Sequence, residues 1–121
     1  MRWVRAFGWL PVPVFYVRGL FAGGFAPLVL ILIDEKYRAD EGLHQHELEH
    51  IEQAYRLLLL PHALLYVLFR RYRLRSEVAA YRRQIAAYGA GASIEFAVRH
   101  LVEGYRLGIT AEEARALLAA S

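Results

Sequence analysis

Residues 40–61 read DEGLHQHELEHIEQAYRLLLLP and contain HELEH, a match to the pattern HExxH. Residues four apart lie on the same face of an α-helix, so the imidazoles of His46 and His50 can approach one ion, with Glu47 beside them. The apolar residues around the pattern are spaced as in a helix with one buried side. We therefore expect a helix that carries a metal site and organises the rest of the fold.

The predicted helix has defined ends and a buried stripe. Asp40 is a typical N-cap and Pro61 ends the run, which predicts one helix of about twenty residues. Its buried stripe consists of Leu43, His46, Glu47, His50, Ile51, Ala54, Leu57 and Leu58. We expect a solvated opposite side, formed by His44, Gln45, Glu49, Glu52 and Gln53. Two alternatives stay open: His44 approaches the metal from the preceding turn, or all polar groups of the helix are merely solvated.

The residue types in HELEH suit hydrolysis by a bound metal. Neutral imidazole suits zinc, whose catalytic sites keep three protein ligands and one water, and the pKa of that water falls to about 7. Glu47 would take the proton from this water as it attacks a carbonyl group, and would return the proton to the leaving amine. The pattern therefore predicts Zn²⁺ as cofactor and a peptide or protein as substrate.

The third protein ligand must come from elsewhere in the chain, and we predict that it is Glu77. This residue is expected to open a second helix, whose pattern continues with Tyr81, Gln84, Ile85 and Tyr88. Ala79 and Ala80 would let this helix approach the first one closely. In the alternative, Glu77 pairs with Arg73, four residues earlier.

HELEH, followed after a helix-breaking proline by Glu77 with small residues behind it, resembles the gluzincin metallopeptidases. The short chain is similar to the minigluzincins and to small phage and bacterial proteins that carry HELxH. The resemblance covers residues 25–90. It implies that His46, His50 and Glu77 bind zinc and that Glu47 is the general base.

Gluzincins usually offer a further His or Tyr that stabilises the oxyanion. The candidates here are Tyr72, Tyr81, Tyr88 and His100. We predict Tyr81, which lies one helical turn beyond Glu77 and whose hydroxyl could donate to the developing charge. The alternative for Tyr81 is a core or interface tyrosine.

The N-terminal region contains two runs with the composition of β-strands. Residues 13–17 and 28–33 flank the turn residues 22–24, which predicts a hairpin. The second arm is apolar on both faces and should be covered on both, with Asp34 returning to water. The resemblance implies a small sheet ahead of the motif helix, with an edge strand that holds extended substrate.

The C-terminal region is expected to brace the site helix. Ser93 can cap a helix that runs to about Tyr105, and Thr110 with Glu113 forms a capping box for a last helix through Leu118. A second His–Glu pair, His100 and Glu103, is more typical of a surface hydrogen bond than of a metal site. The whole chain, 1–121, is predicted to be a single α+β domain, mostly helical, with the N-terminal hairpin packed on the HExxH helix.

The apolar composition raises a membrane interpretation, because 57% of the residues are hydrophobic and the mean hydropathy is +0.23. The uncharged run 19–33 is shorter than the roughly 20 residues needed to cross a bilayer. Residues 57–69 are apolar but contain Pro61, and arginines follow; we expect a core helix, with peripheral membrane contact as the alternative. The N-terminus lacks a convincing signal peptide, so a cytoplasmic location is favoured.

Charge and cysteine content restrict the partners. The net charge of +3 comes from fourteen Arg and one Lys against twelve acids, but no nucleic-acid-binding motif is present, so nucleic acid is not expected. The absence of cysteine excludes disulfides and a thiolate zinc site. The rival to a peptidase is a non-enzymatic membrane-peripheral or assembly protein with a structural or inactive metal site. No feature of the sequence specifies an oligomeric state.

Overall fold

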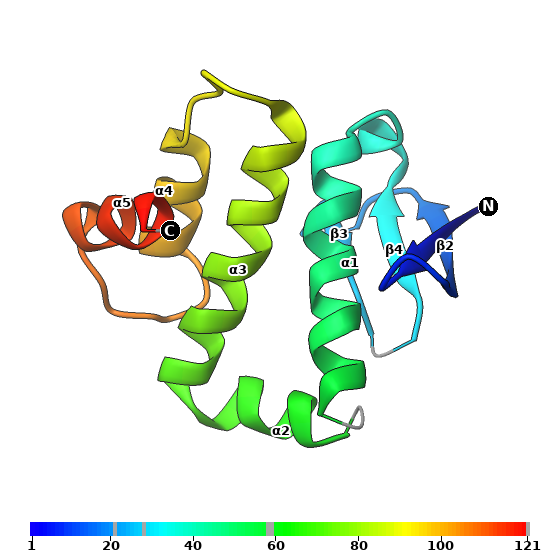
Figure 1. The fold of residues 1–121 in the computed structure, drawn as a ribbon, viewed down its shortest axis with the longest axis horizontal. Helices are drawn as coiled ribbons and strands as arrows, with labels where there is room; N and C mark the ends of the chain where they lie inside the picture. The colour runs from blue at the N-terminus through cyan, green and yellow to red at the C-terminus, as the bar shows by residue number, and fades with distance from the viewer. Residues whose placement is uncertain (21, 28, 58–59, 121) are drawn as a thin grey trace.

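The computed structural model describes residues 1–20, 22–27, 29–57 and 60–120, which form an α+β arrangement of successive layers (Figure 1). Its strands are β1 (Arg2–Ala6), β2 (Leu10–Val17), β3 (Gly24–Phe25) and β4 (Ile31–Asp34). A 3-10 turn, η1 (Glu35–Tyr37), precedes the α-helices α1 (Glu41–Arg56), α2 (Leu60–Leu68), α3 (Arg70–Tyr88), α4 (Glu95–Glu103) and α5 (Ala111–Ala119). The sheet covers one side of α1, α3 lies on the other, and α4 and α5 pack on the far side of α3. The predicted fold class is confirmed.

The strand order in the sheet is β1-β2-β4-β3, and it corrects the predicted hairpin. The segments 13–17 and 28–33, of which residue 28 lies outside the described residues, do not form antiparallel arms, because β2 and β4 pair in parallel. The antiparallel pairs are β1 with β2 and β3 with β4. The turn between β1 and β2 has positive φ at Phe7 (54°) and Gly8 (78°), as tight hairpin turns require.

β2 begins at Leu10, before the predicted run 13–17, and therefore contains two prolines. Pro11 and Pro13 pair with Arg5 and Trp3 of β1. On the other side of β2, β4 pairs only with the residues from Val14 to Val17. On the side away from β1, the first half of β2 is therefore a sheet edge. A missing N–H is tolerated at such an edge.

Helix α1 begins as predicted but is shorter. The Asp40 side chain accepts a hydrogen bond from the backbone N–H of Leu43 at 2.9 Å, so the N-cap is confirmed. The prediction of one helix over residues 40–61 is wrong, because α1 ends at Arg56 and Pro61 lies in the first turn of α2. That position suits proline, since the first N–H groups of a helix have no partner within the helix. Leu58 of the predicted stripe lies outside the described residues.

Two apolar cores lie on either side of the α1–α3 pair. The core between the sheet and α1 consists of Ala6, Val12, Val14, Ile31, Ile33, Leu48 and Ile51. The core among α3, α4 and α5 consists of Val78, Tyr81, Ala97, Val98, Leu101, Leu107, Ala114 and Leu118. Because α1 is covered on two sides, the predicted solvation of His44 and Glu52 is wrong: they are 1% and 6% exposed. Asp34 is also buried, accepting hydrogen bonds from the N–H groups of Leu20 and Lys36.

The remaining helix boundaries differ modestly from prediction. Helix α3 begins at Arg70, so Glu77 lies within it and does not open it. Helix α4 has Ile94 as its N-cap and ends at Glu103, although the Ser93 hydroxyl accepts from the N–H of Glu95. The capping box of Thr110 is confirmed. None of the helices built from the described residues is long and apolar enough to span a bilayer.

Candidate metal centre

The imidazoles of His46 and His50 converge on the carboxylate of Glu77 between α1 and α3. His46 Nε2 lies 3.3 Å from Glu77 Oε1, and His50 Nε2 lies 3.3 Å from Glu77 Oε2. One ligand atom from each residue falls within 4.8 Å of the other two. The three side chains predicted as ligands from sequence spacing therefore lie together.

Small residues let the two helices approach. At Gly42 of α1, an added Cβ would lie 2.2 Å from a ring carbon of Tyr88, so the ring of Tyr88 crosses α1 where no side chain is present. On α3, Ala80 is fully buried. The close approach brings Glu77, in the middle of α3, opposite the histidines of α1.

A chain of hydrogen bonds specifies which nitrogen of His46 carries the proton. The Asp40 carboxylate can only accept, so the Tyr88 hydroxyl donates to it at 2.8 Å. The Tyr88 oxygen then accepts from Gln84 Nε2 at 2.8 Å, which turns Gln84 Oε1 toward His46 Nδ1 at 2.9 Å. His46 Nδ1 must therefore be the donor. Its Nε2 is left with a free lone pair directed at the cluster, the arrangement that metal-binding histidines need.

His50 is oriented by a second set of partners. The Ser76 hydroxyl donates to Gln53 Oε1 at 2.5 Å, so the oxygen of Ser76 can accept from His50 Nδ1, 3.1 Å away. Gln53 is itself held, because its Nε2 donates to the backbone oxygen of Ser76 and to Glu49. The Nε2 of His50 is again the nitrogen that faces Glu77.

Burial and charge oppose each other in this cluster. Burial by itself would raise the pKa of Glu77, which is 2% exposed, but the charge of His50 and the two imidazoles beside the carboxylate hold that pKa well below its usual range. Burial by itself would lower the pKa of His50, but attraction to the Glu77 carboxylate raises the pKa to about 9. The Glu77 carboxylate and the His50 imidazole thus stabilise each other's charged forms.

The residues present fit a zinc ion. Glu77 Oε1 is buried and has no hydrogen-bond partner among the described residues, although buried carboxylate oxygens usually have one. Two imidazole nitrogens and one carboxylate oxygen are a donor set found in catalytic zinc sites. A cation between the three side chains would satisfy the unpartnered oxygen.

Glu47 lies beside the cluster and against the sheet. Its side chain is buried, and burial raises its pKa even though His46 and His50 act in the opposite direction. A Cβ added to Gly24 would lie 2.7 Å from Glu47 Oε1, so the carboxyl group packs on the backbone of β3. β3 is the last strand in the sheet order, so the edge strand beside Glu47 is β3, not an arm of the predicted hairpin.

The tyrosine predicted to stabilise the oxyanion adjoins the cluster. The ring of Tyr81 meets the ring of His46 edge-on, with centroids 4.4 Å apart. Its hydroxyl lies 2.6 Å from that of Tyr105, and the ring of His100 stacks on it. The other candidates are engaged elsewhere, since Tyr72 hydrogen-bonds to His62 and Tyr88 to Asp40. The oxyanion role of Tyr81 stays a prediction.

Two alternatives that the sequence left open are wrong: the approach of His44 to the metal site, and the pairing of Glu77 with Arg73. His44 does not approach the cluster: its Nδ1 bonds the backbone oxygen of Asp40 at 2.6 Å and its Nε2 lies 2.8 Å from the hydroxyl of Tyr16, on the side of the sheet. Arg73 donates to backbone oxygens, including those of Tyr66 and Tyr105, in place of the pairing with Glu77 that was considered.

Sequence reasoning missed Tyr66. Its hydroxyl donates to Glu77 Oε2, and its ring lies edge-on to His50. A signal was available, because Tyr66 carries the one hydroxyl of the apolar run 57–69 and a buried hydroxyl needs a partner. The sequence could not show which partner, since the pairing depends on how α2 crosses the ends of α1 and α3.

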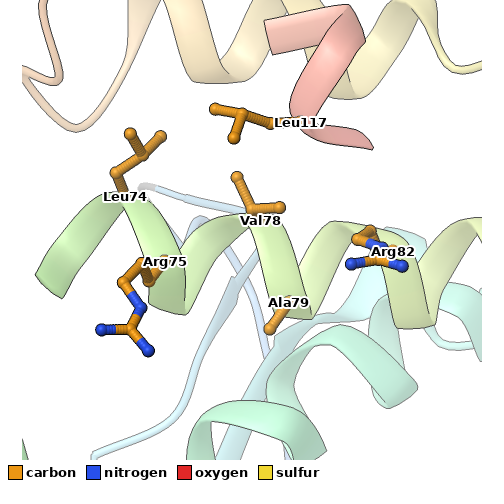
Figure 2. A pocket seen from close by; sticks show the side chains of 6 residues that line it. All are labelled: Leu74, Arg75, Val78, Ala79, Arg82 and Leu117. Atoms are coloured by element: carbon orange, nitrogen blue, oxygen red, sulfur yellow. The ribbon is translucent and has the colours of Figure 1, made fainter. Parts of the chain in front are cut away.

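The two hollows described on the surface border α3, and neither is lined by His46, His50 or Glu77. The first lies between α3 and α5, where Leu74 and Val78 extend toward Leu117 (Figure 2). The second is lined in part by Gln53 and Ser76, the residues that orient His50.

Comparison of the chain with known proteins finds no match among family models, curated proteins or solved structures.

Proposed function

We propose that this protein is a zinc-dependent metallopeptidase in which His46, His50 and Glu77 hold the ion and Glu47 is the general base. One observation carries the proposal: both Nε2 atoms face a single buried carboxylate, while both Nδ1 atoms are engaged by oriented partners. Metal-ligating histidines are commonly held by a hydrogen bond at their second nitrogen. The resemblance of HELEH and Glu77 to the gluzincins supports the same assignment.

Glu47 would perform the proton transfers. Bound zinc would supply a Lewis acid for the substrate carbonyl and a water with a pKa of about 7. The carboxylate of Glu47 takes the proton of the attacking water and delivers it to the leaving amine. Burial, which raises the pKa of Glu47, makes this carboxylate a stronger base than an exposed glutamate.

The sheet edge suggests how substrate would be held. Because β3 is the terminal strand and packs on Glu47, an extended peptide that added to this edge would pass close to the base. We therefore propose unstructured peptide or protein segments as substrates.

For Tyr81 to act as the oxyanion donor, its hydroxyl would have to turn from Tyr105 toward the cluster. Tyr81→Phe would then lower kcat with little effect on zinc affinity.

The test combines metal analysis with digestion of an unstructured protein such as casein and of a peptide library. We expect one zinc per chain after loading, and hydrolysis that Glu47→Gln reduces by about 10²–10⁴-fold without loss of zinc. Glu95→Gln, which alters an exposed carboxylate paired with Arg115, is the matched control and should leave hydrolysis unchanged. Zinc binding without hydrolysis of any substrate would exclude the peptidase, and absence of zinc would exclude the metal centre as well.

A structural or inactive metal site in a non-enzymatic protein is the second candidate. It is favoured by the enclosure of the cluster: the side chains of His46, His50 and Glu77 are only 5%, 12% and 2% exposed, and Tyr66 donates to Glu77. Structural zinc sites are closed, whereas catalytic sites keep one position open. In this case zinc would raise the melting temperature, and Glu47→Gln would have no measurable consequence.

A further inference from the structure

Helix α2 presents an apolar surface to solvent. This α2 patch comprises Leu64, Val67, Leu68 and Phe69, which are 53%, 70%, 68% and 57% exposed. At 100° per residue, the three patch residues within α2 lie on the side opposite His62 and Tyr66. Those two residues face inward, because they hydrogen-bond to Tyr72 and Glu77 of α3. The patch is therefore the outer face of the helix that crosses the end of the molecule.

Uncompensated positive charge adjoins the patch. Arg70, Arg71 and Arg75 are exposed and form no hydrogen bond or ion pair with any residue that the structure describes. In Figure 2 the side chain of Arg75 extends away from the apolar side chains of the neighbouring hollow. The sequence contains no Asp or Glu between Gln53 and Glu77, and Glu77 is buried. An anionic surface would meet no repelling carboxylate in this segment.

We propose that the α2 patch and its arginines dock on an anionic membrane surface, with α2 lying in the plane of the interface. Apolar side chains next to unpaired guanidinium groups match the boundary between acyl chains and anionic headgroups. The patch projects outward and has only four side chains. A stable protein–protein interface buries about 800 Å² on each partner, more than four partly exposed side chains supply.

This docking would place the metal centre one helix away from the lipid. Tyr66 lies on the inner face of α2 and donates to Glu77, whereas the patch lies on the outer face of the same helix. The inference does not depend on the proposed peptidase activity, because the patch contains none of the four residues assigned to that chemistry. It can be tested with or without zinc.

The test is cosedimentation of the full chain with vesicles of phosphatidylcholine alone or mixed with phosphatidylserine. We expect binding only to the anionic vesicles, weakening as salt is added. Arg70→Gln with Arg71→Gln should lower the affinity about 30-fold, since each basic residue near the surface contributes about fivefold. Val67→Gln with Leu68→Gln should lower it at least about tenfold.

The matched controls lie on α4. Arg99→Gln removes an exposed arginine and Val102→Gln an apolar side chain that is 37% exposed, and neither should alter vesicle binding. Because all substituted side chains reach solvent, thermal melting should confirm that every variant folds. Three results would overturn the proposal: no binding to anionic vesicles, equal binding to neutral vesicles, or equal weakening by the α4 controls. A dimer in solution that Leu68→Gln dissociates would also overturn it, by showing that a second copy covers the patch.

Discussion

The two sides of α1 differ in what they bury: an apolar core with polar groups such as His44 and Glu47 beside it on the sheet side, and a polar layer on the α3 side. Toward the sheet, Leu48 and Ile51 join an apolar core that includes Ile31 and Ile33. Toward α3, the contacts are made by a polar layer of His46, His50, Gln53, Ser76, Glu77 and Gln84. Burying polar and ionisable groups costs free energy that an apolar contact would not, even when the groups are paired. We infer that the sheet side serves mainly stability, whereas the α3 side carries the proposed metal centre.

The largest expected effect is on the sheet side. Ile33→Ala removes a fully buried side chain and should lower the free energy of unfolding by about 2–5 kcal/mol. It should leave the zinc affinity of the folded protein unchanged, because Ile33 is not part of the polar layer. Denaturant unfolding and chelator competition measure the two quantities. If Ile33→Ala weakened zinc binding as much as the substitution of a proposed ligand does, the two sides of α1 would not have separate roles.

The next largest effect is on the α3 side. Glu77→Ala removes a proposed ligand and should weaken zinc binding by more than about 100-fold, beyond the range typical for the loss of an outer partner. Glu41→Ala, which removes an exposed carboxylate of α1 that pairs with Arg2, is the control for general effects of charge. Titration against a zinc-binding dye gives both affinities. Equal affinity of Glu77→Ala and the native chain would remove Glu77 from the ligand set.

A smaller effect is expected from the residue that orients His46. Gln84→Leu keeps the volume but removes the acceptor at His46 Nδ1, so zinc affinity should fall about 10–100-fold. Hydrolysis per zinc-loaded molecule should change little, because Glu47 is untouched. Comparing kcat at saturating zinc with the affinity from dye competition separates the two effects. If kcat falls while affinity holds, Gln84 acts on the reaction and not through His46.

The smallest effect is expected at the outer end of the same chain. Tyr88→Phe keeps the ring against Gly42 but removes the hydroxyl that links Gln84 to Asp40. Gln84 can then turn its amide either way, and zinc affinity should fall by about tenfold or less. Stability should change by about 1 kcal/mol, the usual contribution of one hydrogen bond. An unchanged affinity would show that Gln84 is oriented without Tyr88.

The parts of the fold that depend on local spacing were predictable. The cap at Asp40 and the capping box at Thr110 involve residues three apart in sequence, and the structure contains both. His46 and His50 share a face because they are four apart. The chemistry of zinc requires a third ligand, and the helical pattern at Glu77, with Ala79 and Ala80 beside it, indicates this residue.

Features that depend on tertiary pairing were not predictable. The parallel pairing of β2 with β4 requires a partner from beyond the next turn, and period-two patterns do not distinguish parallel from antiparallel neighbours. The burial of His44 and Glu52 follows from the sheet and α3 covering opposite sides of α1, which a single stripe of apolar residues does not reveal. Tyr66 was missed for the same reason, since its partner lies on another helix.

Gly24 links the sheet edge to the chemistry of the centre through steric exclusion. Its φ is not among the positive values, so the chain needs glycine there for room and not for backbone freedom. A single methyl group at this position would occupy the volume of the Glu47 carboxyl and push it aside without altering its charge or its neighbours on α1. A methyl group at Gly24 of β3 would thus displace the carboxyl group of Glu47 on α1. The register of β3, which places Gly24 at this point, therefore determines the position of that carboxyl group.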